Sequence, residues 1–170
     1  ASLAAKPPMT GARTTSTREG ITDRVSQTRV MRIWNVPQYS SADLQRLQLF
    51  AQVLGGSRSS RLDRRLFFGD KLVDRISASI DASELGGTFD ITADVKQGVD
   101  PALVEKAISE ELDRMLRDGP SEAELEQART VFMASFVRGV ERIGGFGGKA
   151  DALAECTVYT GDPGCFRDQL

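Results

Sequence analysis

The stretch GTFDITADVK, residues 87–96, decides the fold of this chain. Its apolar residues all share one parity, and threonine or aspartate fills the positions between them; the apolar set is Phe89, Ile91, Ala93 and Val95. Successive side chains of a β-strand point to opposite faces, so this alternation predicts a strand with one face on a core and the other toward solvent.

Two further segments are predicted to join this strand in an antiparallel sheet. The sequence ELGG at 84–87 is typical of a hairpin turn. It connects the strand to a preceding one in which Asp74 interrupts an apolar face formed by Leu72, Ile76, Ala78 and Ile80. The segment 27–36 carries apolar residues on both parities before Pro37. That pattern predicts a central strand that is covered on parts of both faces.

Helices are predicted around the sheet from apolar residues at helical spacing and from their start and stop signals. Ser40 with Asp43 opens the first helix, and Gly55-Gly56 ends it. The others are a short helix over 59–67, one from Asp100-Pro101 to Gly119-Pro120 with a stripe from Leu103 to Leu116, one from Ser121, and one over 147–158. This order predicts an α+β fold, an antiparallel sheet with helices packed on one face.

Composition restricts both the domain organisation and the partners. The chain has 170 residues, of which 40% are hydrophobic and 27% are charged, as is typical of one soluble folded domain. Residues 1–20 lack any periodicity and are predicted to be a linker or lead-in to a single domain over 21–170. The net charge of -2 and the lack of a long apolar run predict no nucleic-acid partner and no membrane span.

The chain contains no histidine, which removes the commonest base of hydrolytic triads and the commonest zinc ligand. Its helical acidic residues, Glu110, Glu111, Glu122, Glu124 and Glu126, are interpreted as a solvated face, and so are the arginines at 58, 61, 64 and 65. We therefore predict no catalytic residue and no metal ligand.

A glycine-rich segment at 144–148 has the composition of a phosphate-binding loop but the wrong spacing. The motif requires a glycine where this chain has Ile143, and a serine or threonine where Ala150 follows the lysine. We predict instead a structural corner between helices at Gly144, Gly145, Gly147 and Gly148. The two cysteines, Cys156 and Cys165, flank the turn-forming sequence GDPG. A disulfide and two free thiols are both compatible with that pattern.

Several segments in order resemble the insulinase, pitrilysin and mitochondrial processing peptidase family. They are VMRIWNVP at 30–37, LGGSRSSRL at 54–62, ERIGGFGGKA at 141–150 and GDP at 161–163. The resemblance is to the second domain of a half-molecule, which does not bind zinc. It implies a ferredoxin-like α+β fold, in agreement with the predicted order of elements, and a chain that is truncated at its C-terminus.

The resemblance also implies a function for the parent protein, a zinc-dependent endopeptidase whose two halves enclose an unfolded peptide. Zinc would be held by an inverted H-x-x-E-H motif in the preceding domain, so this chain needs no cofactor of its own. Its expected partners are that zinc-binding domain, the second half of the peptidase and the peptide substrate.

Two positions depart from the family pattern. Family members use an arginine and a tyrosine, seven apart, in the non-catalytic half to support the substrate, and the aligned positions here are Phe67 and Asp74. These departures indicate either the second domain of the catalytic half or a degenerate partner half. The alternative function is a structural subunit of the same fold without proteolysis, like a core protein of a respiratory complex. For the parent peptidase we favour a periplasmic or secreted location.

Overall fold

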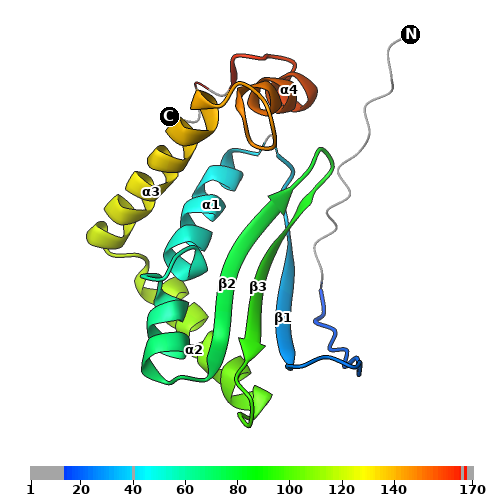
Figure 1. The fold of residues 1–170 in the computed structure, drawn as a ribbon, viewed down its shortest axis with the longest axis vertical. Coiled ribbons are helices and arrows are strands. Elements are labelled where there is room, and N and C mark those ends of the chain that lie inside the picture. Colours follow the sequence, from blue (N-terminus) through cyan, green and yellow to red (C-terminus); the bar gives the residue numbers. More distant parts are fainter. Residues whose placement is uncertain (1–13, 40, 166, 168–170) are drawn as a thin grey trace.

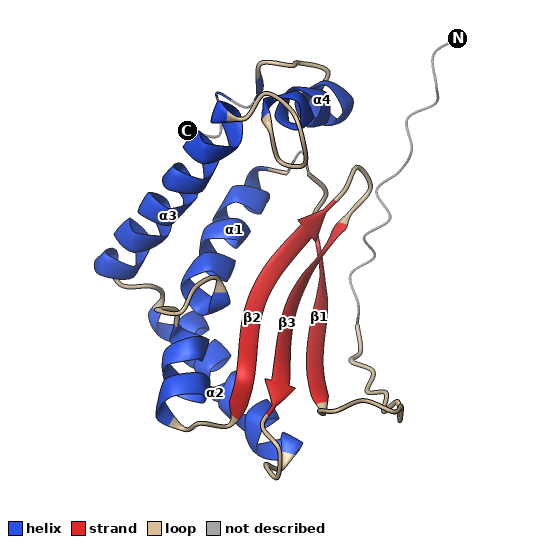
Figure 2. Cartoon of the chain, in the orientation of Figure 1, coloured by secondary structure: helices blue, strands red, loops and turns tan. Residues whose placement is uncertain are grey.

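The computed structural model describes residues 14–39, 41–165 and 167. Helices line one side of a three-stranded antiparallel sheet, which confirms the predicted α+β class (Figures 1 and 2). The elements follow the chain as β1 (Arg29–Val36), α1 (Ala42–Gly55), η1 (Asp63–Gly69), β2 (Val73–Ala82), β3 (Gly87–Val95), α2 (Pro101–Asp118), α3 (Glu122–Glu141) and α4 (Lys149–Thr160).

The strand predicted over 87–96 is β3, the middle strand of this sheet, whose order is β1-β3-β2. All four apolar side chains of β3 are buried, and the polar residues between them are half-buried on the opposite face. The prediction that 27–36 forms a central strand was wrong, because β1 pairs only with β3 within the described chain. Its second apolar parity, Met31 and Ile33, is more than half exposed on the face away from the helices.

A β-bulge at Asp74 explains the interrupted apolar face of β2. Val73 pairs with Val95 and Arg75 pairs with Asp94, which leaves Asp74 as an extra residue in β2. A bulge shifts the parity of the strand, so Val73 and Ile76 both point into the core although they are three residues apart.

Side chains cap the starts of α1, α2 and α3. The Ser41 hydroxyl accepts a hydrogen bond from the Asp43 backbone N–H at the start of α1, whereas the predicted start, Ser40, lies outside the described residues. Asp100 caps α2 through the Ala102 N–H. Ser121 caps α3 in a capping box with Glu124. The short helix differs from its prediction, because residues 63–69 form a π-helix, η1.

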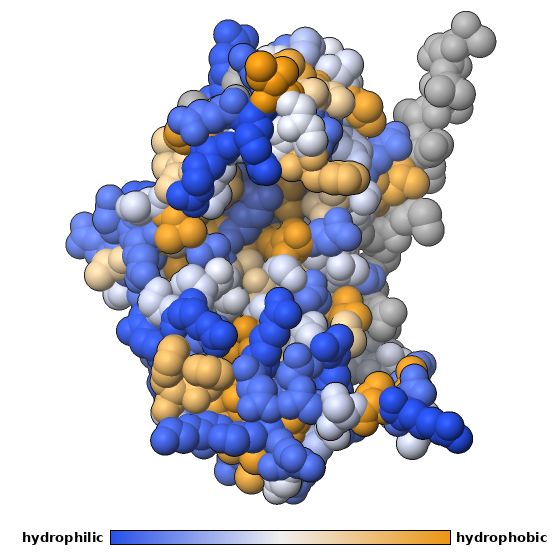
Figure 3. All heavy atoms as spheres, in the orientation of Figure 1, coloured by the Kyte–Doolittle hydropathy of each residue, from blue (hydrophilic) through white to orange (hydrophobic). Residues whose placement is uncertain are grey.

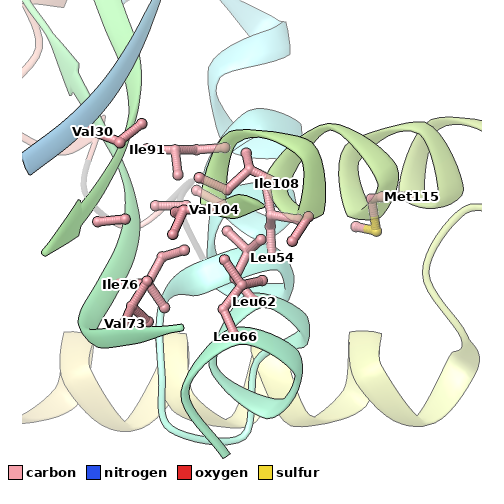
Figure 4. Packing of buried hydrophobic residues seen from close by; sticks show 14 of the residues in the cluster. Val30, Leu54, Leu62, Leu66, Val73, Ile76, Ile91, Val104, Ile108 and Met115 are labelled. Carbon is pink, nitrogen blue, oxygen red and sulfur yellow. The ribbon is translucent and has the colours of Figure 1, made fainter. Parts of the chain in front are cut away.

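The core lies between the helix-facing side of the sheet and the helices α1, η1 and α2. Figure 4 shows side chains from the strands meeting those of the helices. Leu54, Leu62, Leu66, Ile91, Val104 and Ile108 have no exposed surface. The predicted stripe of α2 was too wide, because Leu103 and Leu116 at its margins are exposed. In α3 only Ala128 is buried among the residues whose burial is described.

The face of the molecule that Figure 3 shows is mixed rather than apolar. In the view of Figure 3, hydrophobic residues form scattered groups between hydrophilic ones. None of the helices in the described ranges is both long enough and apolar enough to span a bilayer.

Candidate functional site

The predicted substrate-support position Phe67 lies in η1 within a small aromatic and cationic cluster. The rings of Phe67 and Phe68 meet edge to face with their centroids 4.8 Å apart. The guanidinium carbon of Arg58 lies 4.5 Å from the centroid of the Phe67 ring, within cation–π range. Phe67 packs against the core, whereas Phe68 is about half exposed. We call Arg58, Phe67 and Phe68 the η1 cluster.

A buried carboxylate orients the cation of the η1 cluster. Asp63 accepts hydrogen bonds from Ser60 Oγ at 3.3 Å and from Arg58 Nη1 at 3.4 Å. Burial raises the pKa of Asp63 above its usual value, and the bonds from Ser60 and Arg58 offset part of that increase. Arg58 is thereby held between the Asp63 carboxylate and the Phe67 ring.

The second predicted support position, Asp74, is the bulge residue of β2 and is exposed. Its carboxylate accepts a hydrogen bond from the side-chain amide of Gln27, which precedes β1. Phe67 and Asp74 therefore contact different partners, and the described structure records no interaction that joins their side chains.

The interpretation of the helical charges as a solvated face was wrong for Arg61 and Glu124. Arg61 Nε and Nη2 donate to the two Glu124 carboxylate oxygens at 2.8 and 2.7 Å, and Nη2 also donates to the Gly119 carbonyl oxygen at 2.9 Å. Only 14% and 15% of the two side chains is exposed. The bonds from Arg61, with those from Ser121, lower the pKa of Glu124 to about 2. The ion pair between Arg61 and Glu124 therefore links the segment before η1 to the first turn of α3.

Glu111 also departs from that interpretation, because it is 3% exposed and lies within ion-pair distance of Arg65 and Arg114. A bond from Arg65 lowers the pKa of the neighbouring Glu110. These pairs border an open hollow of about 410 Å³. Carboxylates around the hollow form ion pairs with the arginines that line it. The hollow therefore does not present unpaired arginines to an anionic ligand. Sequence patterns carried no signal for these ion pairs, because Arg61 and Glu124 are 63 residues apart.

The glycine segment connects α3 to α4. Gly145 and Gly147 have φ angles of 85° and 72°, in the left-handed region that favours glycine. A Cβ on Gly148 would lie 2.8 Å from the Gly144 carbonyl oxygen, closer than real contacts allow. The Lys149 N–H donates to the Arg142 carbonyl oxygen at 2.7 Å and closes the loop. The four glycines thus meet in one loop, and their predicted structural role remains a prediction.

Of the two alternatives for the cysteines, the structure has the disulfide. Cys156 lies fully buried in α4 and is bonded to Cys165 in the segment that follows. The Tyr159 ring of the same helix stacks on Tyr39 of the β1–α1 connection, with the centroids 4.6 Å apart. Within the described ranges no group of three or more Asp, Glu, Cys or His side chains is placed to hold a metal ion.

Comparison with known families accounts for this combination of fold and chemistry. The family model described as the peptidase M16 inactive domain matches residues 4–132. The chain belongs to the peptidase M16 inactive-domain family. The resemblance to the insulinase and pitrilysin family is therefore confirmed. No curated protein sequence matches this M16 domain significantly.

Solved structures share the fold of this M16 domain at low sequence identity. A protease from Helicobacter pylori has a TM-score of 0.76 at 19% identity; the match covers 87% of this chain and 35% of that one. A peptidase M16 inactive domain from Pseudomonas fluorescens has a TM-score of 0.70 at 17% identity, with 85% and 33% covered. The inactive peptidase domain of a candidate zinc protease from Bordetella parapertussis has a TM-score of 0.69 at 22% identity, with 88% and 80% covered. The M16 domain thus spans about a third of the first two chains.

Proposed function

We propose that this M16 inactive domain forms part of the wall of a peptide-enclosing chamber in a zinc-dependent endopeptidase and contributes contacts between its two halves. The observation that carries the proposal is membership of the inactive-domain family by a chain that contains no histidine. Zinc and the hydrolytic step belong to the preceding domain of the parent protein. The proposed partners are that domain, the second half and an unfolded peptide.

The η1 cluster is the surface that we assign to the peptide. Phe68 exposes an aromatic ring, and Arg58 presents a guanidinium that Asp63 and Phe67 hold in place. An unfolded peptide exposes apolar side chains and backbone carbonyl oxygens, which an aromatic ring and a guanidinium group bind. This surface includes the family support position at Phe67 but uses different chemistry from the arginine and tyrosine of the family.

A photo-crosslinking experiment in the parent protein tests this assignment. A benzophenone amino acid is placed at position 68 and, as a control, at position 116. Leu116 is an apolar residue on α2 that is more exposed than Phe68, at 73% against 54%. Irradiation with an unfolded peptide should label the variant at 68 and leave the variant at 116 unlabelled. Equal labelling at both positions, or none at 68, would overturn the assignment.

A structural subunit without proteolysis is the second candidate. The departures at Phe67 and Asp74 favour it, because neither side chain supplies the arginine or tyrosine of the family. The two candidates differ in the preceding domain, where an H-x-x-E-H motif and bound zinc identify a peptidase.

The disulfide between Cys156 and Cys165 supports the proposed periplasmic or secreted location, because disulfides persist in oxidising compartments.

A further inference from the structure

The segment from α3 to α4, which we call the C-terminal lobe, contributes little to the core. Among the residues of α3 whose burial is described, only Ala128 is buried. The buried residue of α4, Cys156, is bonded to Cys165 of the segment that follows and is not part of the core cluster. A part of a protein with few buried apolar contacts separates from the rest at a low free energy. The C-terminal lobe therefore has little apolar contact to lose when it moves away from the core.

The surface on which α3 lies beside α1 is mostly polar. Figure 1 shows the two helices side by side. A small hollow where they meet is lined mainly by polar side chains, Gln52, Ser60 and Gln127 among them. Gln127 also donates a hydrogen bond to Ser59 Oγ at 2.5 Å. Polar contacts of this kind are typical of interfaces between parts of a chain that move relative to one another.

The chain enters the C-terminal lobe through a short bend. α2 ends at Asp118, and only Gly119 and Pro120 precede Ser121, which caps α3. Gly119 has a φ angle of 70°, in the left-handed region that favours glycine. A Cβ on Gly119 would meet nothing within 4 Å, so no packed neighbour restrains the backbone there. Hinges are short connections at the ends of helices that absorb a change of backbone angle, and this bend has that position.

Arg61 bridges the two sides of the bend. Its Nη2 donates to the Gly119 carbonyl oxygen at 2.9 Å, and its Nε and Nη2 donate to the Glu124 carboxylate in the first turn of α3 at 2.8 and 2.7 Å. One rigid, planar guanidinium thus fixes the bend and the helix together. At the far end of the lobe, the Tyr159 ring stacks on Tyr39, a contact that a movement of the lobe would separate.

We propose that Gly119-Pro120 is a hinge on which the C-terminal lobe swings away from α1 as a rigid unit, and that Arg61 locks it closed. The swing uncovers Ser59, which Gln127 covers in the closed lobe. The helices of the lobe stay intact when it opens, because α3 keeps its own capping box. This inference goes beyond the proposed function and does not depend on it.

Thiol labelling of the 170-residue chain tests the hinge, since both native cysteines are held in the disulfide. Ala128→Cys places a thiol where α3 packs on the core cluster, and Ala93→Cys places one in the middle strand β3; neither alanine is more than 3% exposed. A water-soluble thiol reagent should react at least about tenfold faster at position 128 than at position 93. The first reaction needs only an open lobe, whereas the second needs an unfolded core.

Removing the lock should accelerate the reaction at position 128. Arg61→Gln and Glu124→Gln should each raise its rate at least about tenfold, because each removes charge-assisted hydrogen bonds from the closed state. The two changes together should raise the rate by less than the product of the single effects, since they break the same contact. Glu126→Gln, at an exposed site on α3, is the matched control and should leave the rate unchanged.

Hydrogen exchange distinguishes a swing of the lobe from local melting of its helices. A rigid swing keeps the helical hydrogen bonds, so the amides of α3 should exchange more slowly than the thiol at position 128 reacts. Amides of α3 that exchange as fast as that thiol reacts would overturn the hinge. Equal reactivity at positions 128 and 93 would overturn it too. An unchanged rate in Arg61→Gln and Glu124→Gln, or the same acceleration in Glu126→Gln, would overturn the lock.

Discussion

Replacing Glu124 with glutamine should remove a defined, pH-dependent part of the stability. The pKa of Glu124 falls from 4.5 to about 2 because Arg61 binds both carboxylate oxygens. A change of that size corresponds to roughly 3 kcal/mol, and contact of the pair with solvent reduces it to about 2 kcal/mol. Glutamine is nearly isosteric and retains the capping position, so Glu124→Gln removes mainly the charge.

The stability difference between the wild type and Glu124→Gln should decrease as the pH falls. The folded-state pKa lies below the unfolded value, so the stabilisation is complete above about pH 5 and disappears as the pH falls to about 2. Urea unfolding should therefore show the wild type about 2 kcal/mol more stable than Glu124→Gln at neutral pH, and nearly equal to it at about pH 2. Glu126→Gln, at an exposed site on the same helix, is the control and should cost little. A difference that stays constant with pH, or that is absent at neutral pH, would refute this account of the ion pair.

Three further predictions concern the fold. Ile91→Asp should abolish cooperative urea unfolding because it buries a charge, whereas Thr92→Asp on the outer face should cost little; equal losses would mean that the register of β3 is wrong. Changing Cys156 and Cys165 together to serine removes a cross-link between residues that are 9 apart in the sequence. Calorimetry should show that the free energy of unfolding falls by about 2.7 kcal/mol. An unchanged stability would mean that the two cysteines are reduced in the native protein. Gly145→Ala should destabilise the chain by about 1 kcal/mol in thermal melts because its φ is 85°, and an unchanged melting temperature would argue against a structural corner.

Local sequence patterns were sufficient to predict most of the elements. The alternation in β3 follows from burial on one face only, and the caps at Ser121 and Asp100 follow from backbone groups that each helix start leaves unpaired. Features that depend on distant residues were not predictable. The bulge at Asp74 changes the parity of β2 through its pairing with β3, so an alternation rule placed the inward face wrongly at its start.

The candidate site was predicted less completely than the fold. Phe67 and Asp74 were located by resemblance, but their partners Arg58 and Gln27 were not. Such contacts depend on how segments approach one another in space, and hydrophobic periodicity carries no information about side-chain pairing between charged residues. For the same reason, charge patterning predicts a solvated Glu124, whereas its contact with Arg61 from another segment leaves only 15% of its side chain exposed.

The central claim is that this M16 domain supports a peptidase without carrying its chemistry, and metal analysis of the purified chain with a peptide-hydrolysis assay tests it most directly. A catalytic zinc site uses three protein ligands, whereas this chain has no histidine and both of its cysteines form a disulfide. We predict zinc well below one ion per chain and no hydrolysis of an unfolded peptide. One tightly bound zinc per chain, or hydrolysis that a chelator abolishes and that persists through purification, would contradict the account.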